Sequence, residues 1–234
     1  VLTGKSSNFN GVQVFRNGSS LNNIVFASLL NIETGDTPHG LAVGDIDGDG
    51  KPDIAVTNKA SNTVSILRNT SSGNTISFAP KIDFATGKTP HNVCIGDIDM
   101  DGKPEIIVTA SAIMRVSVYR NISSPGAIAF ENNVDFETGV NPWSVALNDL
   151  NGDGLKDVVL CNWTSSTVSL FRNTSYLGKI SFAPRADMGT GTHPNSVALG
   201  DLNNDGKADL VVGYSIKSGV SIYENLSVNN HISF

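Results

Sequence analysis

The sequence predicts an all-β fold of repeated four-stranded antiparallel sheets, the architecture of a β-propeller, from three observations. An acid-rich loop recurs at a step of 52 residues, starting at positions 45, 97, 149 and 201. Each step contains four segments of strand length, and none of them keeps a helical period. Glycine is frequent, at 23 of 234 residues, and charged residues are only 16%. This composition favours many short strands and turns over helices.

The step of 52 residues also holds outside the acid-rich loops. It relates a set of asparagines, Asn17, Asn69, Asn121, Asn173 and Asn225, and the prolines Pro38, Pro90, Pro142 and Pro194. A constant period indicates one supersecondary unit per repeat. A β-solenoid would also be periodic, but its rungs are usually shorter, so the propeller is the preferred interpretation.

One repeat illustrates the four predicted strands. They are expected at residues 92–98, 105–110, 116–120 and 128–137. The first runs into the acid-rich loop, the second is a β-branched run that leaves it, and the third alternates apolar and polar residues. A Thr-Gly-x-x-Pro segment then marks the link to the next repeat.

We expect one domain over residues 1–234, with incomplete units at both ends. The expected units are 1–36 (partial blade), 37–88, 89–140, 141–192 and 193–234 (incomplete blade). The 234 residues correspond to 4.5 periods of 52, with Val1 inside a second strand and Phe234 early in a fourth. We therefore expect a fragment of a larger propeller or a ring closed by another chain. Open ends of a blade stack expose apolar faces and favour self-association.

The acid-rich loop has the spacing of a calcium site. In the first loop Asp45, Asp47, Asp49 and Asp53 stand at places 1, 3, 5 and 9, and Gly50 stands at place 6. A sharp turn at the glycine lets the side chains converge while the carbonyl of place 7 points inward, giving the hard oxygen ligands that Ca²⁺ prefers. We expect up to four Ca²⁺ ions. The candidate ligands are Asp45, Asp47, Asp49, Lys51, Asp53; Asp97, Asp99, Asp101, Lys103, Glu105; Asp149, Asn151, Asp153, Leu155, Asp157; and Asp201, Asn203, Asp205, Lys207, Asp209.

A set of Asx-rich turns without an ion is the alternative, because Asp, Asn and Gly all favour turns. The metal is preferred because several carboxylates held together repel one another unless a cation lies between them. Asn151 and Asn203 lower the ligand charge at place 3, so weaker binding is expected in the last two loops. At a dissociation constant of about 10⁻⁴ M and about 1 mM calcium, each site would stabilise the fold by about 1.4 kcal/mol.

The formal charge of −6 reflects these loops, which hold 14 of the 22 Asp and Glu residues. No basic stripe suggests nucleic-acid binding, and no apolar run is long enough for insertion into a membrane. The start, Val1 to Gly4, lacks the pattern of a cleavable signal, as expected of a mature form or an excised piece.

A second candidate site lies on the loops at the opposite ends of the strands. The residue after the repeated proline is His39, His91 or Trp143 in three units, and a strand-two to strand-three loop contributes Trp163. Amphipathic aromatic rings beside polar groups are typical of sugar or protein recognition. The candidate ligand-binding residues are therefore Trp143, Trp163, His39 and His91; the alternative is that the tryptophans simply pack between blades.

Two further patterns have structural interpretations. Asn162 and the five periodic asparagines fit the glycosylation pattern Asn-x-Ser/Thr. A turn after the third strand explains the periodic ones equally well and is preferred. Cys94 and Cys161 stand where other units have small residues, so we expect small buried residues with free thiols.

The segment from Pro38 to Val56, Pro-His-Gly-Leu-Ala-Val-Gly-Asp-Ile-Asp-Gly-Asp-Gly-Lys-Pro-Asp-Ile-Ala-Val, resembles the FG-GAP/VCBS repeats of bacterial secreted proteins and the calcium-binding blades of integrin α-subunits. The resemblance covers nearly the whole chain. It implies a β-propeller, usually of seven blades, whose acid loop joins the innermost strand to the second, and a secreted or cell-surface location in a bacterium. The family's Phe-Gly and Gly-Ala-Pro signatures are absent as such, and pairs such as Thr57-Asn58 end the second strand instead.

These observations favour binding over catalysis. His39, His91, His193 and His231 lie in loops or near the end, without a Gly-x-Ser-x-Gly elbow or a His-Glu-x-x-His pair. We do not expect an enzyme. We expect a calcium-binding extracellular module that recognises a carbohydrate or a protein on its tryptophan face. The alternative is a structural accessory domain of a larger secreted protein.

Overall fold

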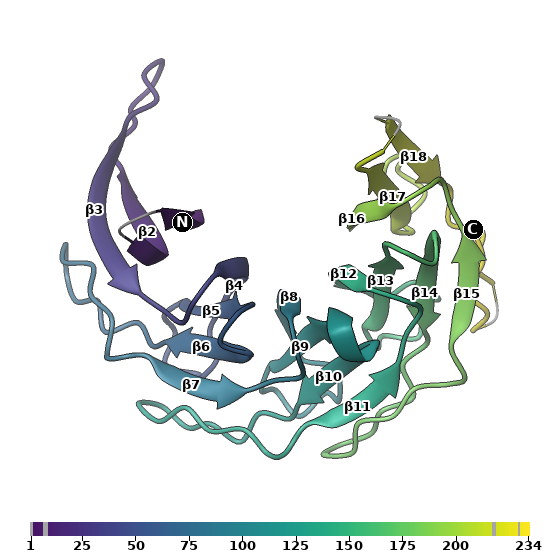
Figure 1. The fold of residues 1–234 in the computed structure, drawn as a ribbon, viewed down its shortest axis with the longest axis horizontal. Coiled ribbons are helices and arrows are strands. Elements are labelled where there is room, and N and C mark those ends of the chain that lie inside the picture. The colour runs from purple at the N-terminus through teal and green to yellow at the C-terminus, as the bar shows by residue number, and fades with distance from the viewer. Residues whose placement is uncertain (1, 7–8, 217–218, 229) are drawn as a thin grey trace.

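The computed structural model describes residues 2–6, 9–216, 219–228 and 230–234. The described chain is all-β apart from one 3₁₀ turn, η1 (Ser111–Ile113). Its strands form five antiparallel sheets, which follow one another along an open arc (Figure 1). The expected propeller-type fold is confirmed, with each sheet as one blade.

Three complete blades lie between two three-stranded ones. The first blade holds β1 (Leu2–Ser6), β2 (Phe9–Asn17) and β3 (Phe26–Glu33). The complete blades are β4 (Pro38–Gly44), β5 (Asp53–Asn58), β6 (Thr63–Leu67) and β7 (Ile82–Ala85); β8 (Pro90–Gly96), β9 (Glu105–Ala110), β10 (Arg115–Tyr119) and β11 (Val134–Glu137); and β12 (Pro142–Asn148), β13 (Asp157–Asn162), β14 (Thr167–Phe171) and β15 (Ala186–Gly189). The fifth blade holds β16 (Pro194–Gly200), β17 (Asp209–Tyr214) and β18 (Gly219–Tyr223).

Strand order within a blade follows the chain, as in β4-β5-β6-β7. The inner strands β4, β8, β12 and β16 lie toward the concave side of the arc, and β7, β11 and β15 run along its convex side (Figure 1). Neighbouring inner strands contact one another, so successive blades are in register. The first strand of every complete blade therefore ends on the same side of the arc.

The hydrophobic core lies between blades. The second strands β5, β9 and β13 are buried at every residue, as a strand covered on both faces requires. Each apolar cluster joins two consecutive blades; for example, Ile66 of β6 packs with Ile106 and Val108 of β9. A blade therefore needs a neighbour on each face to bury its apolar side chains.

The observed strands differ from the predicted ones mainly at the outer edge. The strand predicted at 105–110 is β9, and the one predicted at 92–98 begins at Pro90 and ends at Gly96. The strand predicted at 128–137 is wrong in its first half, because β11 begins at Val134. Phe130 instead forms an isolated bridge to Asn121 that closes a long hairpin.

The first and last sheets each hold three strands within the described residues. Leu2–Ser6 pairs with β2 as the second strand of a blade would, one step of 52 before β5, whereas Val1 lies outside the described residues. Cys94 and Cys161 are free thiols, as predicted, with Cys161 buried and Cys94 half-buried. No helix among the described residues has the length and hydropathy needed to span a membrane.

Candidate metal centres and aromatic ladder

The four acid loops connect the inner strand of a blade to its second strand. The glycine at place 6 has a positive φ in every loop, for example 85° at Gly50 and 84° at Gly102. This left-handed conformation suits glycine because it has no Cβ. The turn directs the amides of Gly48 and Gly50 to the Asp45 carboxylate, each at 2.9 Å. The sharp turn predicted at place 6 is present.

The acid at place 9 anchors the loop to its own blade. In the first loop Asp53 is fully buried, and its oxygens accept hydrogen bonds from the amides of Ile46 (3.0 Å) and Asn69 (2.8 Å). The same pair of bonds recurs at Glu105, Asp157 and Asp209. Place 9 therefore ties the start of the loop to the end of the third strand.

Burial perturbs these place-9 acids. Desolvation raises the pKa of Glu105 to about 7, opposed by its backbone hydrogen bonds and reinforced by the charges of Asp99 and Asp101. Desolvation likewise raises the pKa of Asp157 to about 6 and that of Asp53 above its ordinary value. Negative charge is therefore costly at these positions unless a cation is near.

The first two loops contain acid triads that could hold a metal ion. One oxygen each of Asp45, Asp47 and Asp53 lie within 4.8 Å of one another, and those of Asp97, Asp99 and Asp101 do the same. In the second loop Asp97 Oδ1 is buried without a hydrogen-bond partner. Carboxylate oxygens and an unpaired buried oxygen fit a hard cation such as Ca²⁺.

The last two loops have the same turn but a different charge. Their place-3 residues are asparagines, and among the described residues neither loop forms an acid triad. Asn151 Nδ2 donates to Asp153 at 2.9 Å, and Asn203 Nδ2 donates to Glu224 at 3.3 Å. In the third loop the amide of Asn151 therefore occupies an acid that a cation would otherwise bind, whereas in the fourth loop the amide of Asn203 is directed to Glu224, outside the loop.

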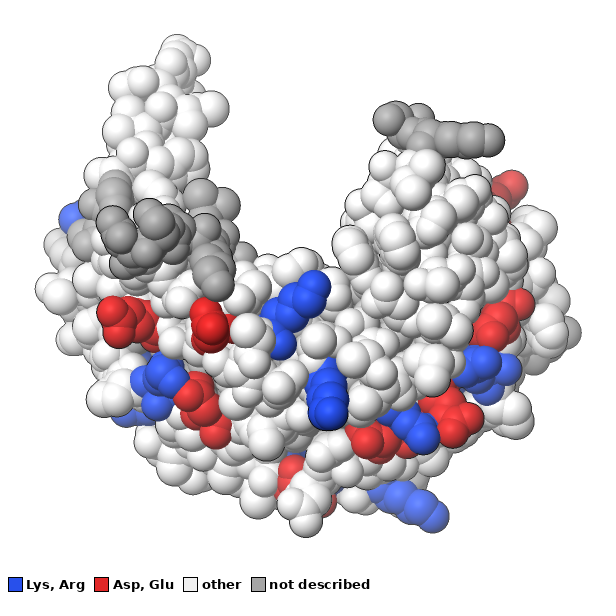
Figure 2. Space-filling view, in the orientation of Figure 1, with Lys and Arg blue, Asp and Glu red and all other residues white. Residues whose placement is uncertain are grey.

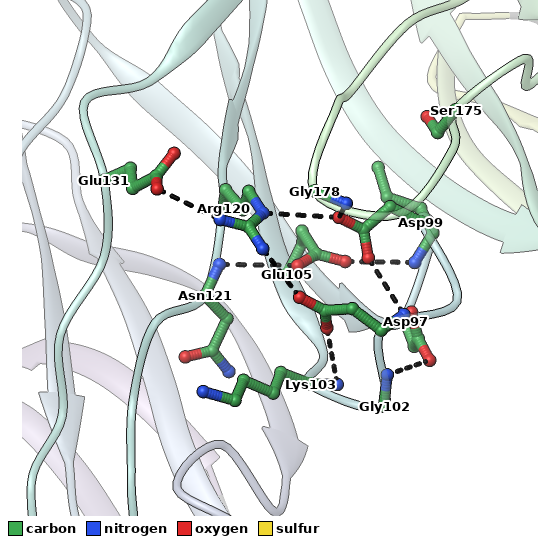
Figure 3. A network of polar contacts seen from close by, with 12 residues as sticks. Asp97, Asp99, Gly102, Lys103, Glu105, Arg120, Asn121, Glu131, Ser175 and Gly178 are labelled. Carbon is green, nitrogen blue, oxygen red and sulfur yellow. Dashed lines mark hydrogen bonds and ion pairs between the residues drawn. The ribbon is translucent and has the colours of Figure 1, made fainter.

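An arginine that the sequence analysis did not single out lies against the second triad (Figure 3). Arg120 donates from Nε to Asp99 (3.3 Å), from Nη2 to Asp101 (2.9 Å) and from Nη1 to Glu131 (3.0 Å). It directly follows the third strand β10, 15 residues after Glu105 in the chain. The guanidinium offsets part of the negative charge of the triad. The sequence signal that could have identified this residue is the recurrence of Arg directly before the periodic asparagine.

The acid at place 3 also links its loop to the next blade. Asp47 Oδ2 accepts the amide of Gly126 and Asp99 Oδ2 accepts the amide of Gly178, both at 2.9 Å and both 79 residues further along the chain. The aspartates of the two triads are therefore shared between a candidate metal site and a blade interface. A metal ion in such a loop would reinforce contact with the following blade.

The periodic asparagines fasten consecutive blades together. Asn121 Nδ2 donates to the carbonyl oxygens of Ile46 and Pro104, both at 2.8 Å. Asn173 and Asn225 reach carbonyls 75 residues earlier in the same way. All three side chains are buried. These geometries support the turn interpretation over glycosylation at these positions.

Aromatic rings form a continuous ladder at the opposite ends of the inner strands. The ring centroids are 4.6 Å apart for His39 and His91, 4.7 Å for His91 and Trp143, 5.7 Å for Trp143 and Trp163, and 4.1 Å for Trp163 and His193. We call these five residues the aromatic ladder. The structure brings together all four predicted ligand-binding residues and adds His193, which precedes the repeated proline instead of following it.

The ladder crosses blade interfaces and keeps an accessible side. Trp143 and Trp163 are half-buried, His39 is exposed and His91 is buried. The indole nitrogens donate to Asn141 Oδ1 and Ser215 Oγ, each at 3.0 Å. Burial, with the charges of Lys59 and His39, lowers the pKa of His91 to about 3, so this ring is neutral at physiological pH.

Comparison with known proteins agrees with this geometry. The FG-GAP-like repeat family matches residues 1–56, 45–108 and 149–212, which together contain all four acid loops. The chain belongs to this family of repeats. A search of curated proteins gave no match.

Two solved structures support the fold, and a third is similar at a lower score. A crystal structure of BBS1N in complex with ARL6DN, soaked with lead, has a TM-score of 0.51 and 14% identity over 82% of this chain and 57% of that chain. The mercury-soaked crystal has a TM-score of 0.51 and 13% identity over 81% and 58%. A protein from Lactobacillus plantarum is similar at a TM-score of 0.47 and 13% identity, over 90% and 66%. The present chain spans less than two thirds of the length of either BBS1N chain.

Proposed function

We propose that this chain is a calcium-stabilised, secreted or cell-surface module that binds a carbohydrate or a protein ligand, with a lectin-like or adhesive role. The observation that carries the proposal is the aromatic ladder, whose two half-buried indoles stack on each other within the fourth blade and contact His91 and His193 on either side. The acid loops lie at the other ends of the same inner strands. In this proposal the acid loops stabilise the fold and the aromatic ladder binds the ligand.

Calcium has a structural role in this proposal. The acids of places 1, 3, 5 and 9 and the place-7 carbonyl would hold the ion. Two loops have a full acid triad, and their place-3 acids also contact the next blade. Bound cations offset carboxylate repulsion, so they would stiffen the blade stack that carries the ladder.

The chemistry of the ladder favours an uncharged or weakly charged ligand surface. His91 stays neutral, and the indole N–H groups are already paired. What remains is ring surface, which suits the apolar face of a sugar or an amphipathic protein segment. We propose binding without catalysis, because the raised pKa values of the acid loops belong to buried carboxyls held by backbone amides.

A glycan array and a panel of extracellular-matrix proteins, each probed with calcium and with chelator, would test this proposal. We expect binding that Trp163→Ala abolishes while the melting temperature changes little. Tyr176→Ala is the matched control, because Tyr176 is an exposed aromatic residue outside the ladder. Absence of any bound sugar or protein, or equal binding by Trp163→Ala, would refute the ligand-binding role.

A purely structural role is the second candidate, and one observation favours it. Trp143 stacks at 4.7 Å on His91 of the preceding blade, so its ring contributes to blade packing. If the chain is only an accessory scaffold, Trp143→Ala lowers the melting temperature and no ladder variant alters binding to any ligand. Thermal melts of the same variants used on the array separate the two candidates.

A further inference from the structure

The guanidinium of Arg120 pairs with two acids of the second loop that a metal ion would also need (Figure 3). It bridges Asp99 and Asp101, which stand at places 3 and 5. The side chain of Asp99 is 0% exposed, that of Asp101 is 15% exposed and that of Arg120 is 22% exposed. Ion pairs that are shielded from water are stronger than exposed ones. A cation in this loop would therefore have to share these oxygens with the guanidinium.

A hairpin of the following blade confines Arg120 in this position. The amide of Gly178 donates to the same oxygen of Asp99, Oδ2, that accepts the Nε of Arg120. Gly178 has a φ of 78°, and a Cβ at this residue would lie 3.1 Å from the Nη2 of Arg120. The guanidinium therefore lies between the second acid loop and the bare backbone of the hairpin.

The first loop has its equivalent arginine in a different place. Arg68 stands one step of 52 before Arg120, and Gly126 stands one step before Gly178. A Cβ at Gly126 would meet nothing within 4 Å, so the guanidinium of Arg68 does not lie beside this glycine. Within the part of the chain that the structure describes, Arg68 forms no ion pair with the first acid loop. The acids of the first triad are therefore not paired with a guanidinium.

A single side chain accounts for the difference between the two loops. Arg120 Nη1 donates to Glu131 Oε1 at 3.0 Å, and the amide of Glu131 donates to the carbonyl of Arg120 at 2.9 Å. The residues one step before and after Glu131 are Ala79 and Ala183. The amide of Ala79 makes the same backbone bond to Arg68, also at 2.9 Å. Among the three complete blades, only the third therefore has a carboxylate at this position to hold the guanidinium over its acid loop.

We propose that Arg120 sets the calcium affinity of the second loop by competing with the ion for Asp99 and Asp101, so that the first loop fills at a lower calcium concentration. This inference rests on the calcium binding proposed above. Both loops carry four acids, so their formal charge predicts equal affinity. The fixed positive charge of Arg120 repels a cation in the second loop. In the calcium-free protein the same charge offsets repulsion between the carboxylates and stabilises the loop.

Titration calorimetry of the 234-residue chain with calcium would test this inference. Arg120→Gln should tighten calcium binding by the second loop about tenfold, because it removes a positive charge in contact with the acids. Arg68→Gln is the matched control and should change calcium affinity by less than about twofold, since it removes the same charge from the equivalent position without an ion pair to the loop. Adding Asp97→Asn to Arg120→Gln should abolish the gain, because Asp97 belongs to the second triad and its oxygens are not paired with Arg120.

Thermal melts with and without calcium separate this role from a merely structural one. Arg120→Gln should melt at a lower temperature than the unmodified chain without calcium, yet show a larger rise when calcium is added. A merely structural arginine would lower both melting temperatures equally, which would overturn the inference. Arg120→Met provides a second variant if Arg120→Gln misfolds, as judged by circular dichroism.

Two calorimetric results would overturn the inference while leaving calcium binding in place. These are an unchanged calcium affinity in Arg120→Gln and a gain in affinity that survives Asp97→Asn. Calcium binding by neither the unmodified chain nor the variants would overturn this inference together with the structural role of calcium in the proposed function.

Discussion

Neutralising the buried acid Glu105 should reveal what calcium does for this fold. Glu105 is 0% exposed, and its pKa is raised from 4.5 to about 7, mainly by burial. A carboxyl whose pKa is higher in the folded than in the unfolded state stabilises the fold when protonated. That contribution is fully present below about pH 4.5 and is lost as the pH rises through about 7.

The expected magnitude follows from the two pKa values. At about 1.36 kcal/mol per pKa unit, the full difference corresponds to about 3.4 kcal/mol of unfolding free energy, of which about 2.5 kcal/mol is lost between pH 5 and 8 in the calcium-free protein. A bound cation favours the charged carboxylate, so the loss should be smaller with calcium. Glu105→Gln removes the titrating group and should flatten the calcium-free profile by the same amount.

Urea unfolding of the calcium-free and calcium-loaded proteins at several pH values measures both effects. Glu33→Gln, at an exposed carboxylate of the first blade, is the matched control and should leave the profile unchanged. The reasoning fails if Glu105→Gln keeps the slope of the unmodified protein, or if calcium leaves that slope the same.

Three further outcomes are expected. Asn121→Ala should lower the free energy of unfolding in urea by about 3 kcal/mol, because it leaves the buried carbonyls of two loops unpaired. Asn17→Ala, at the exposed equivalent position, should lower it by less than about 1 kcal/mol. Equal losses would contradict the role of the buried asparagine in fastening the blades. Asp99→Asn should weaken calcium binding in calorimetry by about tenfold or more. It should also lower the melting temperature without calcium, because donors approach both oxygens of Asp99 and asparagine keeps only one oxygen and no charge to pair with Arg120. Unchanged affinity would remove the second triad as a metal site. Cys161, whose pKa burial raises to about 11, should react with iodoacetamide only in denaturant; prompt labelling of the native chain, read by mass spectrometry, would show that this thiol is accessible.

Two further predictions concern nucleic acid as a partner and the location of the protein. Figure 2 shows Lys and Arg interspersed with Asp and Glu on the visible face, without a continuous basic stripe there. That nucleic acid is not a partner stays a prediction, which a binding assay with DNA and RNA would test. The location at the cell surface is likewise a proposal, supported by the family and by the calcium chemistry of the loops.

The sequence by itself determined the repeat and everything local to it. The step of 52 residues located the blades, and the spacing from Asp45 to Asp53 located the turn with its positive φ at Gly50. The position of the acid loop, a β-branched run and an alternating segment identified the inner three strands of each blade, because these patterns are properties of consecutive residues. The start of β11 at Val134 was missed, since a hairpin with isolated bridges replaces regular pairing there.

Only the tertiary structure decided which residues distant in the sequence meet. Arg120 lies against Asp99 and Asp101. Asn121 reaches a carbonyl 75 residues away, and His193 completes the aromatic ladder. Equivalent positions share nearly the same local sequence in every repeat, so local pattern cannot distinguish a covered copy from an open one. Burial distinguishes them: Leu170 and Ile222 occupy the same repeat position, yet one is 7% and the other 64% exposed, because within the described residues a further blade packs only on the first.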